Sequence, residues 1–368
     1  MTQARHFETT FGFSNYDECY DIIELSSGDI VAAGYSGSGG LGEADFFLQS
    51  MSPDGSDQWN GFYGGADFDQ CYSVVEDGDG SLFLGGFSSS WGLGYTDYLV
   101  VKLNASGDQL WSKTFGSIGL ERAYDMICTP DNNLLLSGSF QADPRSTSGV
   151  GIMSLNSNGE ELWQAHFDGP NEKVIRSTCL TEDNQMVLAG WSNAGAEDEM
   201  LLVKIDSQGE LLWEKSFGST GTERCHDIVL CLDGGFLLAG YQFIDFEKNR
   251  ELYMVKTDAQ GNQLWDLAWG GELNDEAWAV EQDPSGALFI AGFSESFSVG
   301  GNDACLLKVS EFGVPLGHKS FGGISHDYSR AMHLASNGDI LLGGYTYSSG
   351  AGLNDYYIIR TDSTVNPL

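Results

Sequence analysis

The amino-acid sequence predicts an all-β chain of seven four-stranded sheets arranged in a ring. Three observations lead to this prediction. A unit of about 50 residues recurs seven times, each unit holds four short apolar segments, and the last unit lacks its fourth segment, which the N-terminus supplies. Tandem units of this length and content are typical of the β-propeller, in which each unit forms one blade. We therefore expect residues 1–368 to form a single seven-bladed domain.

A glycine that closes a short apolar run marks the repeat. The runs include SLFLGG at 81–86, QMVLAG at 185–190 and ALFIAG at 287–292. The closing glycines are spaced by 52, 52, 52, 50, 52 and 52 residues and are Gly34, Gly86, Gly138, Gly190, Gly240, Gly292 and Gly344. The predicted units cover about 17–68, 69–120, 121–172, 173–222, 223–274, 275–326 and 327–362.

Within a unit, four segments have the length and composition of strands. In the second unit they are YSVVED (72–77), SLFLGGF (81–87), DYLVVKL (97–103) and QLWSKTF (109–115). They are rich in β-branched and aromatic residues and are bounded by Gly, Asn, Asp and Ser, which favour turns. A tryptophan recurs in the fourth segment, and we expect it to pack one blade on the next. These residues are Trp59, Trp111, Trp163, Trp213 and Trp265, whereas Gly317 breaks the pattern in the sixth unit.

The offset ends predict how the ring closes. The seventh unit stops after DYYIIRTD (355–362), while HFETTFG (6–12) aligns with LWSKTFG (110–116) and places Phe7 where Trp111 stands. We expect residues 4–12 to complete the seventh blade, because closure removes exposed strand edges.

The unit pattern D-G-G-x-x-x-A-G followed by K-x-D-x-x-G-x-x-x-W resembles the tandem repeats of bacterial, mostly secreted, β-propeller proteins. The fifth unit carries it in LDGGFLLAG (232–240) and MVKTDAQGNQLW (254–265). The resemblance implies the fold and secretion but no activity. The second piece is also distantly similar to repeats of quinone-dependent dehydrogenases. Those usually have eight blades and need a calcium–quinone site and often an adjacent cysteine pair, none of which is visible here.

Composition limits the partners. Asp and Glu total 53 against 17 Lys and Arg, a formal charge of −36, which repels nucleic acid and anionic membrane surfaces. No run approaches the roughly 18–20 apolar residues of a membrane helix, and MTQARHFETT lacks the apolar core of a signal peptide. Seven cysteines, of which Cys19, Cys71 and Cys225 share one repeat position, indicate buried free thiols. We expect a monomer that is extracellular by resemblance, with a cytoplasmic location as the alternative.

Loop lengths indicate which face binds. The first-to-second and third-to-fourth connections are tight turns, whereas the two other kinds of connection are long and variable and share one face, where binding residues are expected. Its rim includes SSSWGLGYTD (88–97) and QFIDFEKNRE (242–251), with Trp91, Phe243 and Phe246, as a recognition rim or as covers over blade edges.

On that face, the starts of the innermost strands differ from blade to blade. Positions are counted from the first residue of each repeat unit given above. The fourth residue of the seven units is Tyr20, Tyr72, Tyr124, Arg176, His226, Trp278 and Arg330. Their second position adds Arg122 and Arg224, so that four of the eight arginines fall in two columns. Guanidinium groups bind carboxylate, sulfate or phosphate, and aromatic rings stack on sugars, so these residues predict a site for an anionic saccharide in the channel.

A structural alternative stays open. The first position of the same starts carries acids, which could pair with the arginines and seal the channel with salt bridges. These acids are Asp17, Asp69, Glu121, Glu223, Asp275 and Asp327.

Two functions fit the sequence. The first is a binding propeller that recognises a glycan or a protein at the long-loop face. The second is a polysaccharide-cleaving enzyme, most plausibly a lyase on uronic-acid polymers, in which Arg176 neutralises a carboxylate while His226 and Tyr124 move protons. No Ser/His/Asp spacing, phosphate loop or His-Glu-x-x-His motif is present. We expect no cofactor and no metal, although the alternating acids of EDGDGS (76–81) leave calcium as an alternative.

Overall fold

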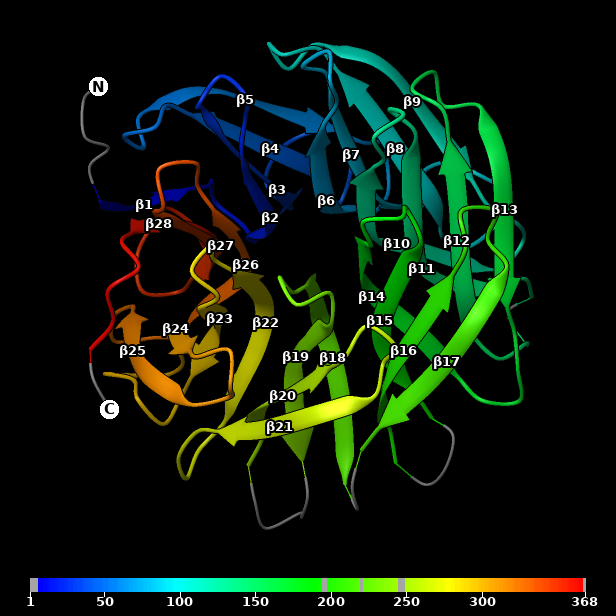
Figure 1. Cartoon of the computed structure of the whole chain (residues 1–368). Coiled ribbons are helices and arrows are strands. Elements are labelled where there is room, and N and C mark those ends of the chain that lie inside the picture. Colours follow the sequence, from blue (N-terminus) through cyan, green and yellow to red (C-terminus); the bar gives the residue numbers. More distant parts are fainter. Residues whose placement is uncertain (1–5, 144, 194–196, 219–220, 244–248, 367–368) are drawn as a thin grey trace.

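A computed structural model describes residues 6–143, 145–193, 197–218, 221–243 and 249–366. Seven antiparallel sheets of four strands surround a central channel, so the predicted seven-bladed β-propeller is confirmed (Figure 1). No helix long and apolar enough to span a membrane occurs in these ranges.

The strands follow the order of the repeat from the channel outward. The innermost strands are β2 (Asp17–Glu24), β6 (Asp69–Glu76), β10 (Leu120–Cys128), β14 (Lys173–Leu180), β18 (Thr222–Leu230), β22 (Asp275–Gln282) and β26 (Asp327–Leu334). The second strands are β3 (Ile30–Ser36), β7 (Leu82–Ser88), β11 (Leu134–Gln141), β15 (Met186–Ser192), β19 (Phe236–Phe243), β23 (Leu288–Ser294) and β27 (Ile340–Thr346). The third strands are β4 (Asp45–Met51), β8 (Asp97–Leu103), β12 (Gly149–Leu155), β16 (Glu199–Ile205), β20 (Glu251–Thr257), β24 (Asp303–Val309) and β28 (Asp355–Thr361). The outer strands are β5 (Asp57–Tyr63), β9 (Gln109–Phe115), β13 (Glu161–Phe167), β17 (Leu211–Phe217), β21 (Gln263–Trp269), β25 (Pro315–Phe321) and β1 (Phe7–Phe11).

The N-terminal strand closes the ring as the offset ends predict. β1 pairs antiparallel with β28, with Phe7 opposite Arg360 and Phe11 opposite Tyr356. The other end of the chain adds a second contact. Asn366 exchanges two backbone hydrogen bonds of 3.0 and 3.1 Å with His318 in β25.

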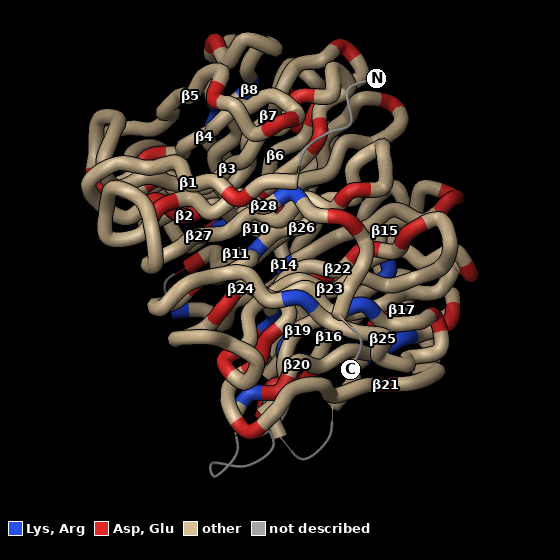
Figure 2. Tube along the Cα trace, turned by 90° about the vertical axis from the view of Figure 1, so that its left-hand side faces the viewer, with Lys and Arg blue, Asp and Glu red and all other residues tan. Residues whose placement is uncertain are grey.

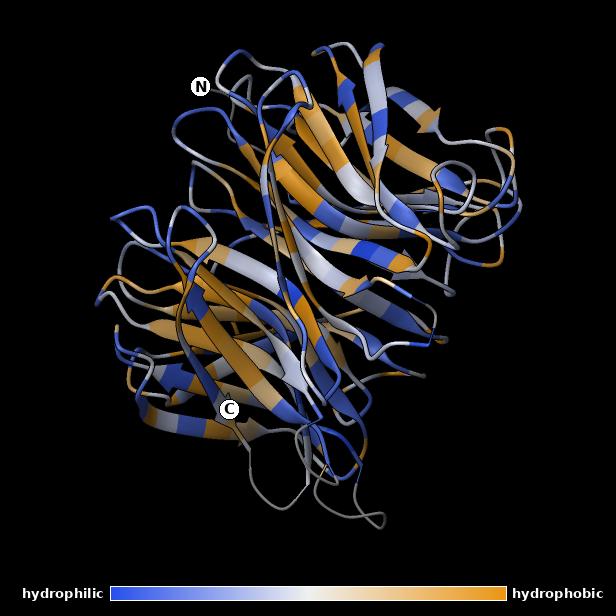
Figure 3. Ribbon diagram, turned by 90° about the vertical axis from the view of Figure 1, so that its right-hand side faces the viewer, coloured by the Kyte–Doolittle hydropathy of each residue, from blue (hydrophilic) through white to orange (hydrophobic). Residues whose placement is uncertain are grey.

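The core lies between neighbouring blades, and the middle strands are rich in hydrophobic residues (Figure 3). Leu48 of the first blade and Leu84 and Leu99 of the second belong to one such buried cluster. In each of the first five blades, the repeated tryptophan of the outer strand packs on the turn of the next blade. A Cβ built on Gly107, whose φ is +84°, would lie 2.5 Å from the Trp59 ring, so this turn needs glycine. All seven cysteines are free.

Candidate functional site

Each innermost strand contains a β-bulge at the fourth residue of its repeat unit. In β2, Cys19 pairs with Gly34 and Asp21 with Ala33, so Tyr20 is the extra residue. The same shift occurs in the six other innermost strands. The residues at the bulges are Tyr20, Tyr72, Tyr124, Arg176, His226, Trp278 and Arg330, the residues of the predicted fourth column.

The periodic glycine allows this bulge. A Cβ built on Gly34 would lie 1.9 Å from the carbonyl oxygen of Glu18, and the equivalent atom on Gly344 would lie 1.8 Å from that of Tyr328. The five other periodic glycines meet the same carbonyl at 1.9 or 2.0 Å. Only a residue without a side chain fits, which explains why the sequence repeats this glycine.

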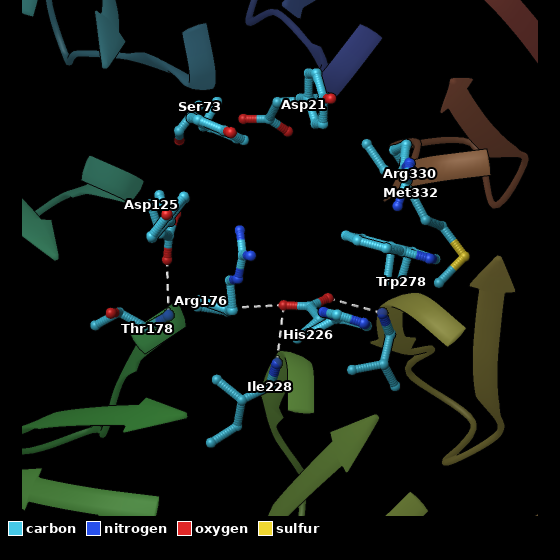
Figure 4. Close-up of a pocket in the computed structure, with 18 of the residues that line it drawn as sticks. Asp21, Ser73, Asp125, Arg176, Thr178, His226, Ile228, Trp278, Arg330 and Met332 are labelled. Carbon is cyan, nitrogen blue, oxygen red and sulfur yellow. Dashed lines mark hydrogen bonds between the residues drawn. The ribbon is translucent and has the colours of Figure 1, made fainter. Parts of the chain in front are cut away.

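The bulge brings two consecutive positions of each strand into the channel, because the extra residue shifts the alternation of the side chains. The fourth-position residues form an upper ring, nearer to the long-loop face. The fifth-position residues form a lower ring of Asp21, Ser73, Asp125, Ser177, Asp227, Ala279 and Ala331. Both rings line one cavity of about 410 Å³ in the middle of the molecule (Figure 4).

Tyrosines form one arc of the upper ring. The ring centres of Tyr20 and Tyr72 lie 4.9 Å apart, and those of Tyr72 and Tyr124 lie 5.0 Å apart. The guanidinium carbon of Arg176 then lies 4.1 Å from the centre of the Tyr124 ring. This arc is a continuous aromatic wall that ends in a cation.

His226, Trp278 and Arg330 form the other arc. The rings of His226 and Trp278 are stacked with centres 3.8 Å apart and planes 7° apart, and the guanidinium carbon of Arg330 lies 3.6 Å from the Trp278 ring. Trp278 lies between the two (Figure 4). Since both faces of the indole are covered, Trp278 has its edge, not a face, left for a ligand, which does not favour the predicted stacking on a sugar. Its Nε1 is buried and has no partner among the described residues.

Two arginines in the cavity have no acidic partner. Across the described ranges, neither Arg176 nor Arg330 forms an ion pair. Arg330 donates one hydrogen bond of 3.0 Å from Nη2 to the Tyr345 hydroxyl, while its Nε and Nη1 and the Nε of Arg176 are buried without a partner in the described chain.

The acids of the first column hold loops instead. Asp17 accepts a hydrogen bond from the backbone N–H of Phe13 (2.7 Å), and Asp327 accepts one from that of Gly323 (2.7 Å). Asp69 and Asp275 bind a glycine N–H of a blade-to-blade link in the same way. These contacts do not support the alternative in which the acids seal the channel by pairing with its arginines.

The two arginines of the second column differ. Arg224 pairs with Asp198 at 2.6 Å and stacks on Trp191, with 4.2 Å from its guanidinium carbon to the ring centre. Arg122 stacks on Phe87 at 4.8 Å. Each stands two residues before the upper-ring residue of its strand, and so lies nearer to the long-loop mouth of the channel.

A fifth arginine and a circle of aromatic residues, neither of them predicted from the sequence, also lie at this mouth. Arg250 follows a long loop, stacks on Tyr241 at 4.6 Å and pairs with Glu276 at 2.9 Å. The residue directly after each periodic glycine pairs, across the sheet, with the second residue of its repeat unit. These residues are Tyr35, Phe87, Ser139, Trp191, Tyr241, Phe293 and Tyr345. An aromatic residue in six of seven repeats was the signal that could have revealed this ring.

His226 is held by a buried acid. Its Nε2 lies 2.9 Å from Glu276 Oε1, and its side chain is 6% exposed. Burial lowers the pKa of His226. Its Nδ1 is also buried and has no partner among the described residues. The contact with Glu276 therefore fixes the orientation of the His226 ring in the wall of the cavity.

The lower ring links blades in pairs. Asp21 accepts hydrogen bonds from the N–H groups of Ile22 and of Val74 in the next blade, both at 2.8 Å. Asp125 binds the N–H of Thr178 in the next blade at 2.7 Å (Figure 4), and Asp227 binds that of Val280 at 2.7 Å. These acids bridge the first blade to the second, the third to the fourth and the fifth to the sixth.

The cavity therefore contains several buried carboxyl groups. Burial raises the pKa of Asp21 to about 6 and that of Asp125 to about 7, and it raises the pKa of Asp227. Glu281 lies on β22, two positions after the lower-ring residue Ala279. Its pKa is raised to about 8 by burial and by the charges of Asp227 and Asp21. The acids thus affect one another across the channel.

The remaining predicted residues lie outside the cavity. Trp91 is 44% exposed on its rim loop, Phe243 ends β19 half-buried, and Phe246 lies outside the described residues. In EDGDGS, Asp77 accepts hydrogen bonds from two backbone N–H groups of its own turn, and its carboxylate lies 3.5 Å from Lys102 Nζ. No group of three or more His, Cys, Asp and Glu side chains suited to a metal ion occurs in the part of the chain that the structure describes.

No protein-family model matches the chain, and no curated protein sequence matches it. The chain is similar to solved β-propellers. These include the α-L-arabinanase of Penicillium chrysogenum complexed with arabinobiose (TM-score 0.53, 11% identity, 97% of this chain and 98% of that chain). They also include Sqt1 from Chaetomium thermophilum (0.51, 10%, 98% and 100%) and a mutant of the NanB sialidase from Streptococcus pneumoniae (0.50, 11%, 98% and 71%). At these identities the likeness shows the fold alone.

Proposed function

We propose that this propeller binds an anionic glycan in its central channel, with Arg176 and Arg330 contacting the anionic group. One observation carries the proposal. In a chain of formal charge −36, two guanidinium groups line the central cavity without an acidic partner among the described residues. Acidic residues are scattered along the chain and far outnumber basic ones (Figure 2), so arginines placed at random would be expected to find one.

The chemistry of the upper ring fits such a ligand. A buried N–H group without a partner costs about 1–3 kcal/mol, and a carboxylate or sulfate accepts hydrogen bonds from two guanidinium nitrogens at once. The unpartnered nitrogens of Arg330 and Arg176 would gain acceptors from a bound anion. A cavity of about 410 Å³ is within the usual size of a small-molecule site, and the tyrosine arc offers an apolar wall to a sugar ring.

The lyase alternative has less support. A lyase needs a base that reaches the substrate, and Nε2 of His226 is already engaged by Glu276 at 2.9 Å. We therefore place binding ahead of cleavage.

The test measures binding of oligogalacturonate and of chondroitin sulfate fragments by calorimetry. Arg176→Ala and Arg330→Ala should each weaken binding about ten- to a hundredfold, which corresponds to roughly 1.5–3 kcal/mol for a lost charged hydrogen bond. Arg145→Ala removes the same charge from an exposed loop and should leave affinity unchanged. A lower melting temperature with unchanged affinity in both channel variants would contradict the proposal. The absorbance of an unsaturated uronate, followed in the same samples, would reveal lyase activity.

A further inference from the structure

The central cavity has opposite charges in its two rings. The upper ring carries the guanidinium groups of Arg176 and Arg330, and the lower ring carries the carboxyl groups of Asp21, Asp125 and Asp227. Because the bulge turns two consecutive residues into the channel, the two rings follow one another directly along the strands. A strand rises about 3.3 Å per residue, so charged groups of the two rings lie on the order of 3–7 Å apart along the channel axis.

The lower ring holds acids without a cation. Among the described residues, no Lys, Arg or His side chain forms an ion pair with Asp21, Asp125, Asp227 or Glu281. The backbone N–H groups that bind Asp125 occupy one site on each of its oxygens, and a carboxylate has about four such sites. A cationic group in the cavity would find free acceptors there and would reduce the repulsion between the acids.

The tyrosine arc stands next to two of these acids, Asp21 and Asp125. Tyr20 precedes Asp21, and Tyr124 precedes Asp125, so an aromatic ring and a carboxyl group adjoin on the same strand. Aromatic faces attract ammonium groups, which adds to the attraction of a carboxylate. The side of the cavity where tyrosines adjoin acids is therefore formed by the first three blades, whereas Arg176 and Arg330 stand on the fourth and seventh.

The upper ring supplies the complementary donors. Arg330 Nε and Nη1, Arg176 Nε and Trp278 Nε1 are buried N–H groups without a partner in the described chain. Buried donors of this kind ordinarily have a water or a ligand as partner. Four of them on one ring, above a ring of acids, indicate a ligand with an anion and a cation a few ångströms apart.

We propose that the ligand is a zwitterionic sugar, an amino-sugar acid whose carboxylate binds Arg176 and Arg330 and whose ammonium group binds Asp21 and Asp125. The inference rests on the proposed function and narrows its ligand class. It assigns the lower ring to ligand recognition in addition to its part in joining the blades.

The test compares three probes that share one ring: glucuronate, 2-amino-2-deoxyglucuronate and glucosamine. Calorimetry with the full chain near neutral pH should give the zwitterion an affinity at least about tenfold above that of either singly charged probe, because only the zwitterion gains both contacts. This comparison needs no variant and so does not depend on a variant's folding.

Variants then separate the two contacts. Asp125→Asn should weaken binding of 2-amino-2-deoxyglucuronate about tenfold and leave glucuronate binding unchanged or stronger, whereas Arg176→Ala should weaken both. Asp79→Asn, in an exposed turn, removes the same charge and should change neither. Melting curves identify any variant that is not folded, and Asp21→Asn provides a second substitution in the lower ring.

Three outcomes would overturn the inference. If glucuronate and its amino analogue bind equally and Asp125→Asn leaves their ratio unchanged, the ligand is an anion, and the proposed function stands without the zwitterion. If Ca²⁺ alone raises the melting temperature as much as the zwitterion does, the lower ring binds metal. If none of the three probes, oligogalacturonate or chondroitin sulfate binds, the proposed function fails as well.

Discussion

At the scale of single residues, the close approach at Gly138 shows what the repeat preserves. A Cβ at this position would lie 2.0 Å from the carbonyl oxygen of Arg122, and the bulge beside it turns Tyr124 into the channel. The backbone and the glycine hold the bulge, and the side chain at the bulge takes no part in that. This explains how tyrosine, arginine, histidine and tryptophan can occupy the same position in different blades.

Gly138→Ala tests this requirement. The new methyl group should force the two strands apart and reduce the free energy of unfolding by about 2 kcal/mol or more, which is the range of overpacked cores. Gly169→Ala is the matched control, because its Cβ would meet no atom closer than 4.0 Å. Urea unfolding of both variants gives the comparison. If they unfold at the same urea concentration, the bulge does not need the glycine.

At the scale of elements, the C-terminal segment explains the exception at Gly317. A Cβ on Gly317 would lie 2.2 Å from the backbone oxygen of Asn366, whose segment crosses β25 there. The outer strands of the first five repeats each have a tryptophan at this position. The seventh blade has no third-to-fourth turn for such a tryptophan to pack on, because its fourth strand comes from the other end of the chain.

Gly317→Trp should therefore destabilise the protein, although it restores the repeat pattern. The indole would displace the segment that ends at Asn366, and we expect a loss of about 1–3 kcal/mol, as for other overpacked sites. The same substitution in a chain that ends at residue 364 should cost clearly less. Thermal unfolding of the four proteins measures the coupling between substitution and segment. Equal losses in the long and the short chain would show that the segment is not the cause.

At the scale of the whole molecule, buried carboxyl groups recur where blades meet. Asp17 adjoins Asp355, and Asp45 adjoins Asp69, with a glycine between the two acids of each pair. Burial, and to a smaller extent the partner acid, raises the pKa of Asp17 and of Asp45, and the same holds for Glu121 and Asp303 at two other junctions. The channel acids add to this set.

Stability should consequently fall as the pH rises from about 4 to about 8. In that window the unfolded chain has released protons that these raised-pKa groups still bind in the folded state, so each pH unit favours unfolding. Glu281→Gln should make the fall smaller between pH 5 and pH 8, because it removes a carboxyl group whose folded pKa is about 8. Glu311→Gln, in an exposed turn, should follow the parent protein. Unfolding free energies across this range provide the measurement, and a constant or rising stability would contradict the expectation.

The sequence contained enough to predict the blades, the closure by β1 and the upper ring. Glycine spacing defines which residues are equivalent, and equivalent residues lie at equal depth in a propeller. The same periodicity carries no information about which neighbour a side chain contacts. Trp278 between His226 and Arg330, and Arg250 on Tyr241, depend on side chains from different blades or on a loop outside the repeat register.

The lower ring was missed for a physical reason. In a regular strand, side chains alternate, so a residue next to a channel-facing one is expected to face away. Asp21 follows Tyr20, and Asp125 follows Tyr124. With regular alternation, the side chains of both aspartates would point away from the channel. The bulge reverses the alternation, and a bulge has no reliable signal in a single sequence.

The pairing of β1 with β28 also determines how the ring responds to tension. Phe7 lies opposite Arg360, so the chain enters and leaves this pair of strands at the same end. A force that pulls the two ends apart would act on one hydrogen-bonded pair at a time and open the seam like a zipper, instead of shearing all the bonds together. The contact of Asn366 with His318 comes before the seam along the pulled chain and would detach first. We therefore expect the ring, which closure protects against exposed edges, to open under tension at the seam where it is closed.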